Sequence, residues 1–279
     1  MEKEKSPEKK SNLGIGPLVE QIGSSDTYTL ARNDSANEGL SELDIRRRSI
    51  RLAAINLQET RPSGRRSLED HKLNITAQLT TFGQSLQELN KLEKQGAQRQ
   101  ERLPALRRVA EFNHAIKEMV DDNQSLRFAE VLSFITNMNQ QINGSEHAGE
   151  GFEQEIRGRL VGMRHEIAYE QIIGRMPGVE CRQPTVDEDL NGADIFVSFN
   201  DSPMVPIDVK ASFETAQSAQ AEASRRGFDA SHIVWSHVND EEFDGGFRIS
   251  EEVIAAKSGY VYNDLLNAVV QQNEATRRS

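Results

Sequence analysis

Residues 192–212, GADIFVSFNDSPMVPIDVKAS, carry the clearest structural signal in this chain. Two short apolar runs flank a polar turn, a pattern that predicts a hairpin of two strands. Side chains alternate along a strand, so Asp208 and Lys210 point to one face and the apolar residues between them to the other. Asp194 opens the neighbouring strand, where it reaches the same spot. The hairpin therefore predicts two carboxylates and one ammonium at one edge of a sheet.

This arrangement of charges needs a partner. Burying charged side chains in apolar strands costs several kcal/mol unless the charges are paired. Two neighbouring carboxylates repel each other, and a divalent cation is the natural third party that relieves the repulsion. The plainer alternative is that Asp208 and Lys210 are an ordinary ion pair on a strand, with consequences for stability only.

Composition limits the classes of protein to consider. The 279 residues are enough for about two domains. No apolar run approaches the ~20 residues of a membrane span, and the Lys- and Glu-rich start is unlike a signal peptide, so we expect no membrane partner. The single cysteine, Cys181, rules out a disulfide within the chain and fits the cytoplasm or another reducing compartment.

The net charge of −11 is unevenly distributed. Residues 1–150 hold 21 Lys and Arg against 22 Asp and Glu, whereas residues 151–279 hold 12 against 22. The part of the chain that contains the hairpin is therefore the acidic part. Tight nonspecific binding of DNA needs a basic surface, so this distribution weighs against it.

The start of the chain has the composition of a disordered segment. Residues 1–43 are rich in Lys, Glu, Ser, Asn and Gly and poor in large apolar side chains, so we predict a disordered tail there. A short basic helix is predicted over residues 45–57, where four arginines stand between apolar residues. Such a helix either contacts nucleic acid or an anionic surface, or packs on the rest of the chain; the second interpretation is favoured.

Residues 44–148 are predicted to form a helical region. Ile75, Leu79, Phe82, Leu86 and Leu89 follow a heptad spacing over about two heptads, and further helices are predicted at 103–121 and 125–142. We expect a small antiparallel bundle or hairpin that packs within the chain, with self-association or a protein partner as the alternative use of its surface. Its two histidines are isolated, and we predict no catalytic residue between residues 70 and 142.

Residues 149–279 are predicted to form a second, α/β domain. A long helix runs from Phe152 to about Arg175, and Glu166 and Glu170 lie on or beside its apolar stripe rather than opposite it. Carboxylates in that position have one of two explanations. Either they have a functional role, or their methylene groups pack on the core while the carboxylate groups reach solvent. Strands at 179–183, at the hairpin and at 231–236 follow, with a helix at 213–226 before the last strand. Two short helices, the first capped by Ser250 and the second at 260–272, complete the chain.

This order of elements, with these residues, resembles the core of the PD-(D/E)XK nuclease superfamily, which includes restriction enzymes and Holliday-junction resolvases. Asp208-Val209-Lys210 matches the Asp/Glu-X-Lys triplet of the family, and Asp194 matches the preceding Asp, with Ala193 in place of the proline. Residues 162–166, GMRHE, are similar to the first helix of the resolvases, which favours Glu166 as the helix carboxylate and leaves Glu170 as the fallback. The resemblance covers residues 152–236.

The resemblance implies a mixed central sheet flanked by helices, with an αβββαβ core behind the helical N-terminal region. It also implies an enzyme, a Mg²⁺- or Mn²⁺-dependent phosphodiesterase acting on nucleic acid, with DNA favoured. Asp194 and Asp208 would ligate the metal, Glu166 would orient a water or complete a second metal site, and Lys210 would act at the phosphate. The alternative is a nuclease-like fold without activity that serves as a binding or scaffolding protein, which the acidic charge favours.

Overall fold

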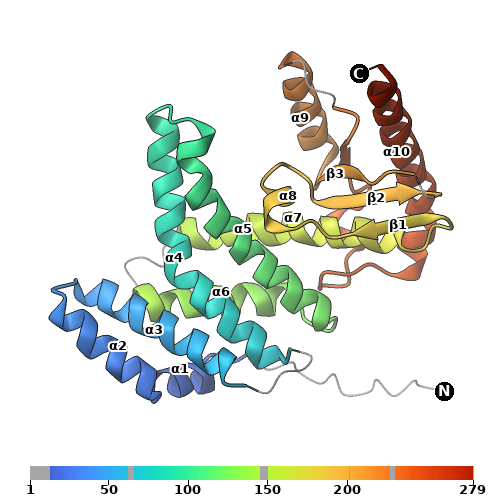
Figure 1. The fold of residues 1–279 in the computed structure, drawn as a ribbon. Helices are drawn as coiled ribbons and strands as arrows, with labels where there is room; N and C mark the ends of the chain where they lie inside the picture. Colours follow the sequence, from blue (N-terminus) through green and yellow to red (C-terminus); the bar gives the residue numbers. More distant parts are fainter. Residues whose placement is uncertain (1–12, 62–65, 145–149, 201, 227–229, 279) are drawn as a thin grey trace, which may run out of the picture.

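The computed structural model describes residues 13–61, 66–144, 150–200, 202–226 and 230–278. The protein is a mixed α and β structure in which a helical N-terminal region precedes a small four-stranded mixed sheet (Figure 1). Helix α7 (Glu150–Ile173) runs from the helical region to the sheet and connects the two. None of the helices within these described ranges is long and apolar enough to cross a membrane.

Within the described residues, the helical region contains six helices before α7, and serine side chains cap the starts of α2, α3 and α4. Ser25, Ser41 and Ser67 each accept a hydrogen bond from a backbone N–H three residues later, which satisfies one of the unpaired donors at a helix start. The bounds of the helices are α1 (Gly16–Gly23), α2 (Asp26–Asn37), α3 (Glu42–Glu59), α4 (Leu68–Lys94), α5 (Arg99–Asp122) and α6 (Phe128–Asn143).

The prediction of a disordered tail is wrong for the described part of residues 1–43. Helices α1 and α2 lie there, and Leu18 and Ile22 of α1 are buried in the core of the helical region. Two apolar residues four positions apart form one narrow helix face. Such a face is enough to stabilise a short helix when neighbouring helices cover it. Residues 1–12 lie outside the described part of the chain.

We expect Leu18→Ala to lower the free energy of unfolding by about 2–5 kcal/mol, because the side chain is fully buried and its removal leaves a cavity. Leu30→Ala on α2 is the matched control, since that leucine is 63% exposed and its loss is expected to change stability by less than about 0.5 kcal/mol. Urea unfolding of both variants measures the difference. Equal effects of the two substitutions would show that α1 does not pack on the core.

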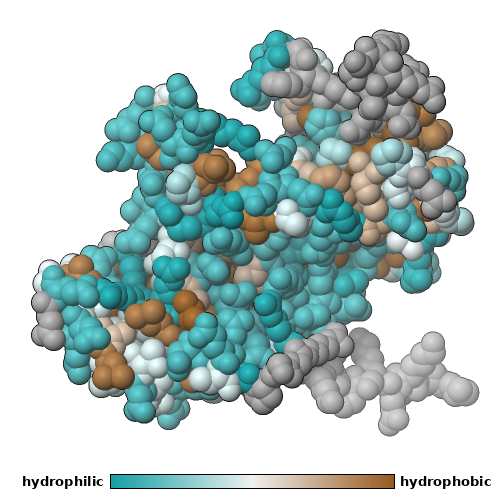
Figure 2. Space-filling view, in the orientation of Figure 1, coloured by the Kyte–Doolittle hydropathy of each residue, from teal (hydrophilic) through white to brown (hydrophobic). Residues whose placement is uncertain are grey.

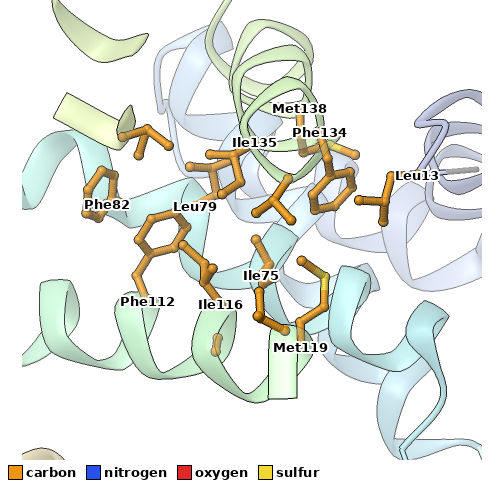
Figure 3. Packing of buried hydrophobic residues seen from close by; sticks show 14 of the residues in the cluster. Leu13, Ile75, Leu79, Phe82, Phe112, Ile116, Met119, Phe134, Ile135 and Met138 are labelled. Carbon is orange, nitrogen blue, oxygen red and sulfur yellow. The ribbon is translucent and has the colours of Figure 1, made fainter. Parts of the chain in front are cut away.

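The heptad positions of α4 pack inside the chain. Ile75, Leu79 and Phe82 are fully buried, and the rings of Phe82 and Phe112 lie with their centroids 4.2 Å apart (Figure 3). This confirms intrachain packing for these three residues. The basic helix α3 also packs on the bundle, because Ala53 and Ala54 are fully buried within the same core.

The sheet has the order β1-β2-β3-β4, antiparallel between the first three strands and parallel between β3 and β4. Figure 1 shows α7 running beside the sheet; α9 packs against β3 and β4, and α10 packs against α7 and β3. The bounds of this part are β1 (Val179–Arg182), α8 (Val186–Asp189), β2 (Ile195–Phe199), β3 (Val205–Lys210), α9 (Phe213–Arg225), β4 (Ile233–Trp235), the 3-10 turn η2 (Asp240–Glu242) and α10 (Glu251–Arg278).

The structure differs from the predicted elements at two places. Between β1 and β2, where we predicted no helix, the acidic segment forms the short helix α8, which Thr185 caps by accepting from the N–H of Glu188. The two short C-terminal helices are one continuous helix, α10. Gly259 does not break it, because Val261 and Leu265 continue the buried face of the helix into the core beside the sheet.

Two hydrophobic cores meet along α7. Residues from Ile156 to Ile167 pack in the core of the helical region, whereas residues from Ala168 to Ile173 pack with the sheet and α10. The predicted domain boundary at residues 148–149 lies outside the described residues, and the change from one core to the other occurs further along, inside α7. On the face shown in Figure 2, hydrophobic residues gather over α1–α3 and beside the sheet, and hydrophilic residues cover most of the rest.

Candidate active site

The hairpin of β2 and β3 brings Asp194, Asp208 and Lys210 together. The backbone N–H of Asp194 donates to the carbonyl oxygen of Ile207 at 2.9 Å, which places Asp194 directly before β2 and beside β3. Its Oδ2 accepts from the N–H of Val209 at 2.7 Å, and Lys210 forms an ion pair with Asp208. The side chains of Asp208 and Lys210 are 16% and 32% exposed, and Val209 between them is buried. The predicted alternation along this strand is confirmed.

Glu166 approaches this group from α7. Burial raises the pKa of Glu166, and the charges of Lys117 and Lys210 oppose that rise. The pKa of Asp194 is raised well above its usual range by burial and by the negative charges of Glu166 and Asp208. Of the two helix carboxylates, Glu166 is the one whose charge acts on Asp194, and both Glu166 and the fallback, Glu170, pair with Lys117. The structure brings Glu166 and the three hairpin residues into one electrostatic group.

Of the three candidate metal ligands, the two aspartates are arranged to hold a divalent cation and Glu166 is not. Asp194 and Asp208 are close enough to repel each other, and their hard oxygen donors are the kind that Mg²⁺ and Mn²⁺ take. Glu166 is turned towards Lys117, with 3.5 Å between Oε2 and Nζ. Over the described ranges, no three His, Cys, Asp or Glu side chains are already gathered in an arrangement that could hold a metal ion. The aspartate pair fits the ion, and Glu166 would have to turn away from Lys117 to join it.

Lys117 of α5 is the residue that the sequence analysis missed. Its Nζ lies 2.6 Å from Oε1 of Glu170 as well as 3.5 Å from Glu166, and its side chain is only 10% exposed. Burial lowers the pKa of Lys117, but the attraction of Glu166 and Glu170 outweighs burial and raises it above the usual range. No finding tests the prediction that residues 70–142 hold no catalytic residue, but Lys117 of this region lies beside two of the candidate carboxylates, Glu166 and Glu170. The available signal was a lysine directly after the buried Ile116 in an apolar part of α5.

A cavity of about 230 Å³ opens beside these residues. It lies between α5, α7 and the connection from β1 to β2, and Glu166 and Asp194 form part of its lining together with Lys117. His114 of α5 also lines the cavity and pairs with Asp189 of α8, with 3.0 Å between Nε2 and Oδ2. The isolated histidine of the sequence thus has a partner on the far side of the cavity, and both carboxylate and cationic side chains face the space.

Comparisons with protein-family models, with curated proteins and with solved structures each found no match.

Proposed function

We propose that this chain is a metal-dependent nuclease that hydrolyses phosphodiester bonds in nucleic acid, with DNA as the favoured substrate. The observation that carries the proposal is the convergence of Asp194, Asp208 and Lys210 on one hairpin, with Glu166 of α7 lining the same cavity as Asp194. The order α7, β1, β2, β3, α9, β4, interrupted only by the short α8, supports a PD-(D/E)XK type of core. Sheet order and strand directions are compatible with it.

In the proposed mechanism, Asp194 and Asp208 would hold Mg²⁺ or Mn²⁺, which supplies Lewis-acid polarisation of the phosphate and lowers the pKa of a bound water. Glu166 orients the attacking water and accepts its proton. The water oxygen forms a new bond to phosphorus, the bond between phosphorus and the leaving ester oxygen breaks, and the leaving oxygen takes up a proton from solvent to become a hydroxyl group. Lys210 stabilises the negative charge that develops on the phosphate oxygens during this displacement.

A second candidate function is a binding protein with a nuclease-like fold and no activity. The observation in its favour is that cations of the chain itself already neutralise the site: Lys210 pairs with Asp208, and Lys117 pairs with Glu166. The acidic composition of residues 151–279 points the same way. In this case the charged residues contribute to stability, and neither a divalent ion nor a phosphodiester is a ligand.

Titration calorimetry with Mg²⁺ and Mn²⁺ distinguishes the two candidates. The nuclease proposal expects saturable binding by the wild-type protein and its loss in Asp194→Asn, because that carboxylate is a ligand. It also expects added stability, roughly 2.7 kcal/mol at a free ion concentration about 100 times Kd. Asp187→Asn is the matched control: this carboxylate is 70% exposed on α8, so its loss should leave binding unchanged. Absence of binding by the wild-type protein would favour the inactive fold.

A further inference from the structure

We propose that Lys117 binds a phosphate oxygen of the substrate, so that the helical region supplies one wall of the active site. This inference rests on the proposed nuclease function and extends it to a residue outside the α/β core. Lys117 is on α5, and the site residues Asp194, Asp208 and Lys210 are on the hairpin of β2 and β3.

The two ion pairs of Lys117 are unequal. The contact with Glu170, at 2.6 Å, is a strong charge-assisted hydrogen bond, whereas the distance of 3.5 Å to Glu166 is at the limit of a hydrogen bond. Glu170 therefore anchors the ammonium, and Glu166 can turn towards the aspartate pair without releasing it. An ammonium has three N–H donors, so the donor that now faces Glu166 and the one that neither pair uses become available to a ligand.

The cavity places these donors beside the reacting groups. Lys117 and Glu166 line the same space as Asp194. Lys117 on α5 pairs with Glu166, and Lys210 on β3 pairs with Asp208, so two different elements each bring a cation to the carboxylates of the site. A phosphate next to Asp194 and Asp208 would be repelled by both carboxylates. Lys117 and Lys210 offset that repulsion, which gives the substrate phosphate two positively charged contacts.

The wall that carries Lys117 is held in place on both sides of that residue. His114 pairs with Asp189 one helical turn before Lys117, and the side-chain amide of Gln183 donates to Asp121 at 2.7 Å one turn after it. Arg107, further towards the start of α5, pairs with Asp187. These contacts join α5 to the connection between β1 and β2 across the cavity. A fixed wall orients the ammonium before a ligand arrives, which lowers the entropic cost of binding.

Lys117→Met and Lys117→Arg test the inference in the full-length protein. The first measurement is anisotropy of a labelled single-stranded DNA oligonucleotide in Ca²⁺, which allows binding to be followed without turnover. The second is calorimetry with Mg²⁺ alone. Lys117→Met is expected to weaken oligonucleotide binding by about 10- to 100-fold, which is the loss of affinity expected when one hydrogen bond between charged groups is removed. Its affinity for Mg²⁺ should be equal to the wild type or tighter, since Glu166 loses a competing partner. Lys117→Arg should recover most of the oligonucleotide binding.

Two controls separate binding from stability. Lys72→Met removes another buried lysine, on α4, which is 2% exposed and pairs with Glu69 at 2.8 Å; it should change stability but not oligonucleotide binding. The double variant Lys117→Met/Glu170→Gln also removes the charge of Glu170, the carboxylate that lies nearest to Lys117, so it should fold even if the single variant does not. It should show the same loss of oligonucleotide binding.

Three results would overturn the inference. The first is wild-type affinity for the oligonucleotide in the folded double variant, which leaves the nuclease proposal intact. The second is a parallel loss of Mg²⁺ affinity in Lys117→Met, which would show that Lys117 acts through the ion site. The third, failure of the wild-type protein to bind both the divalent ion and the oligonucleotide, would overturn the proposed function together with the inference.

Discussion

Asp208→Asn is expected to reduce Mg²⁺-dependent cleavage by at least about 100-fold, the scale on which the loss of a principal electrostatic group acts. The substitution preserves the shape of the side chain, so far-UV circular dichroism should be unchanged. Without metal at neutral pH, the variant should be at least as stable as the wild type, because relief of the repulsion between two partly buried carboxylates offsets the lost ion pair with Lys210. Its neutral side chain no longer repels Asp194, whose pKa is raised by burial and by Glu166 and Asp208.

The sign of the pH dependence follows from that raised pKa. A carboxyl group whose pKa is higher in the folded state binds more protons there than in the unfolded chain, where its pKa is about 3.9. Its contribution therefore favours folding less as pH rises through the interval between the two values. The stability gained by Asp208→Asn should accordingly be greatest at neutral pH and disappear towards about pH 4. Thermal unfolding in a chelator at several pH values measures it.

Lys210→Ala is the companion variant that separates chemistry from metal binding. It should also remove cleavage, because its ammonium acts at the phosphate, but it should leave Mg²⁺ binding largely in place, since an ammonium is not a ligand. If instead both variants retain cleavage and change only stability, Asp208 and Lys210 are an ordinary ion pair on β3, and the mechanism proposed for the site is wrong.

The isolated fragment 150–279 is expected not to form a stable fold. Ile156, Leu160 and Met163 of α7 are buried against the helical region, and the fragment would expose all three. It would also lose Lys117 and leave Glu166 and Glu170 without that cation, which is costly for buried carboxylates. Fluorescence of Trp235, the single tryptophan of the chain, reports unfolding in urea for both the fragment and the whole protein.

A variant fragment with Ile156→Gln and Leu160→Gln is the control, because it removes much of the exposed apolar surface. If exposure of the apolar residues of α7 is the main reason why fragment 150–279 does not fold stably, the variant fragment should be more soluble than the unmodified one. A fragment 150–279 that unfolds cooperatively at the same urea concentration as the whole chain would contradict the shared core and would support an independent domain.

The parts of the site that could be predicted are those encoded by local spacing. Asp208 and Lys210 are two residues apart on a strand, so they share a face, and Glu166 follows from its place beside the apolar stripe of α7. Lys117 could not be predicted in the same way, because its partners Glu166 and Glu170 are 49 and 53 residues further along the chain. No local pattern specifies which helix covers the open side of a cavity.

Two predictions about the fold that proved wrong, those for α1 and α10, have a related cause. The sequence of helix α1 has only a short apolar pattern, and the helix is stabilised because Leu18 and Ile22 are buried against other helices. The surface that covers this pattern belongs to those other helices, so the local pattern alone does not predict helix α1. Helix α10 continues through Gly259 because Val261 and Leu265 are buried beside the sheet. In both cases tertiary packing outweighs local helix propensity. The propensity cost of a glycine inside a helix, for example, is only about 1 kcal/mol relative to alanine.

The nuclease proposal can be tested by cleavage of a panel of labelled single-stranded, duplex and branched DNA, with single-stranded RNA beside them. The wild-type protein and Asp208→Asn are incubated with each substrate in Mg²⁺, in Mn²⁺ and in a chelator. We expect that the wild-type protein cleaves at least one substrate in the presence of either ion, that the chelator stops cleavage, and that Asp208→Asn fails under every condition. Cleavage that persists in the chelator, equal cleavage by Asp208→Asn, or no cleavage of any substrate by the wild-type protein would contradict the proposal.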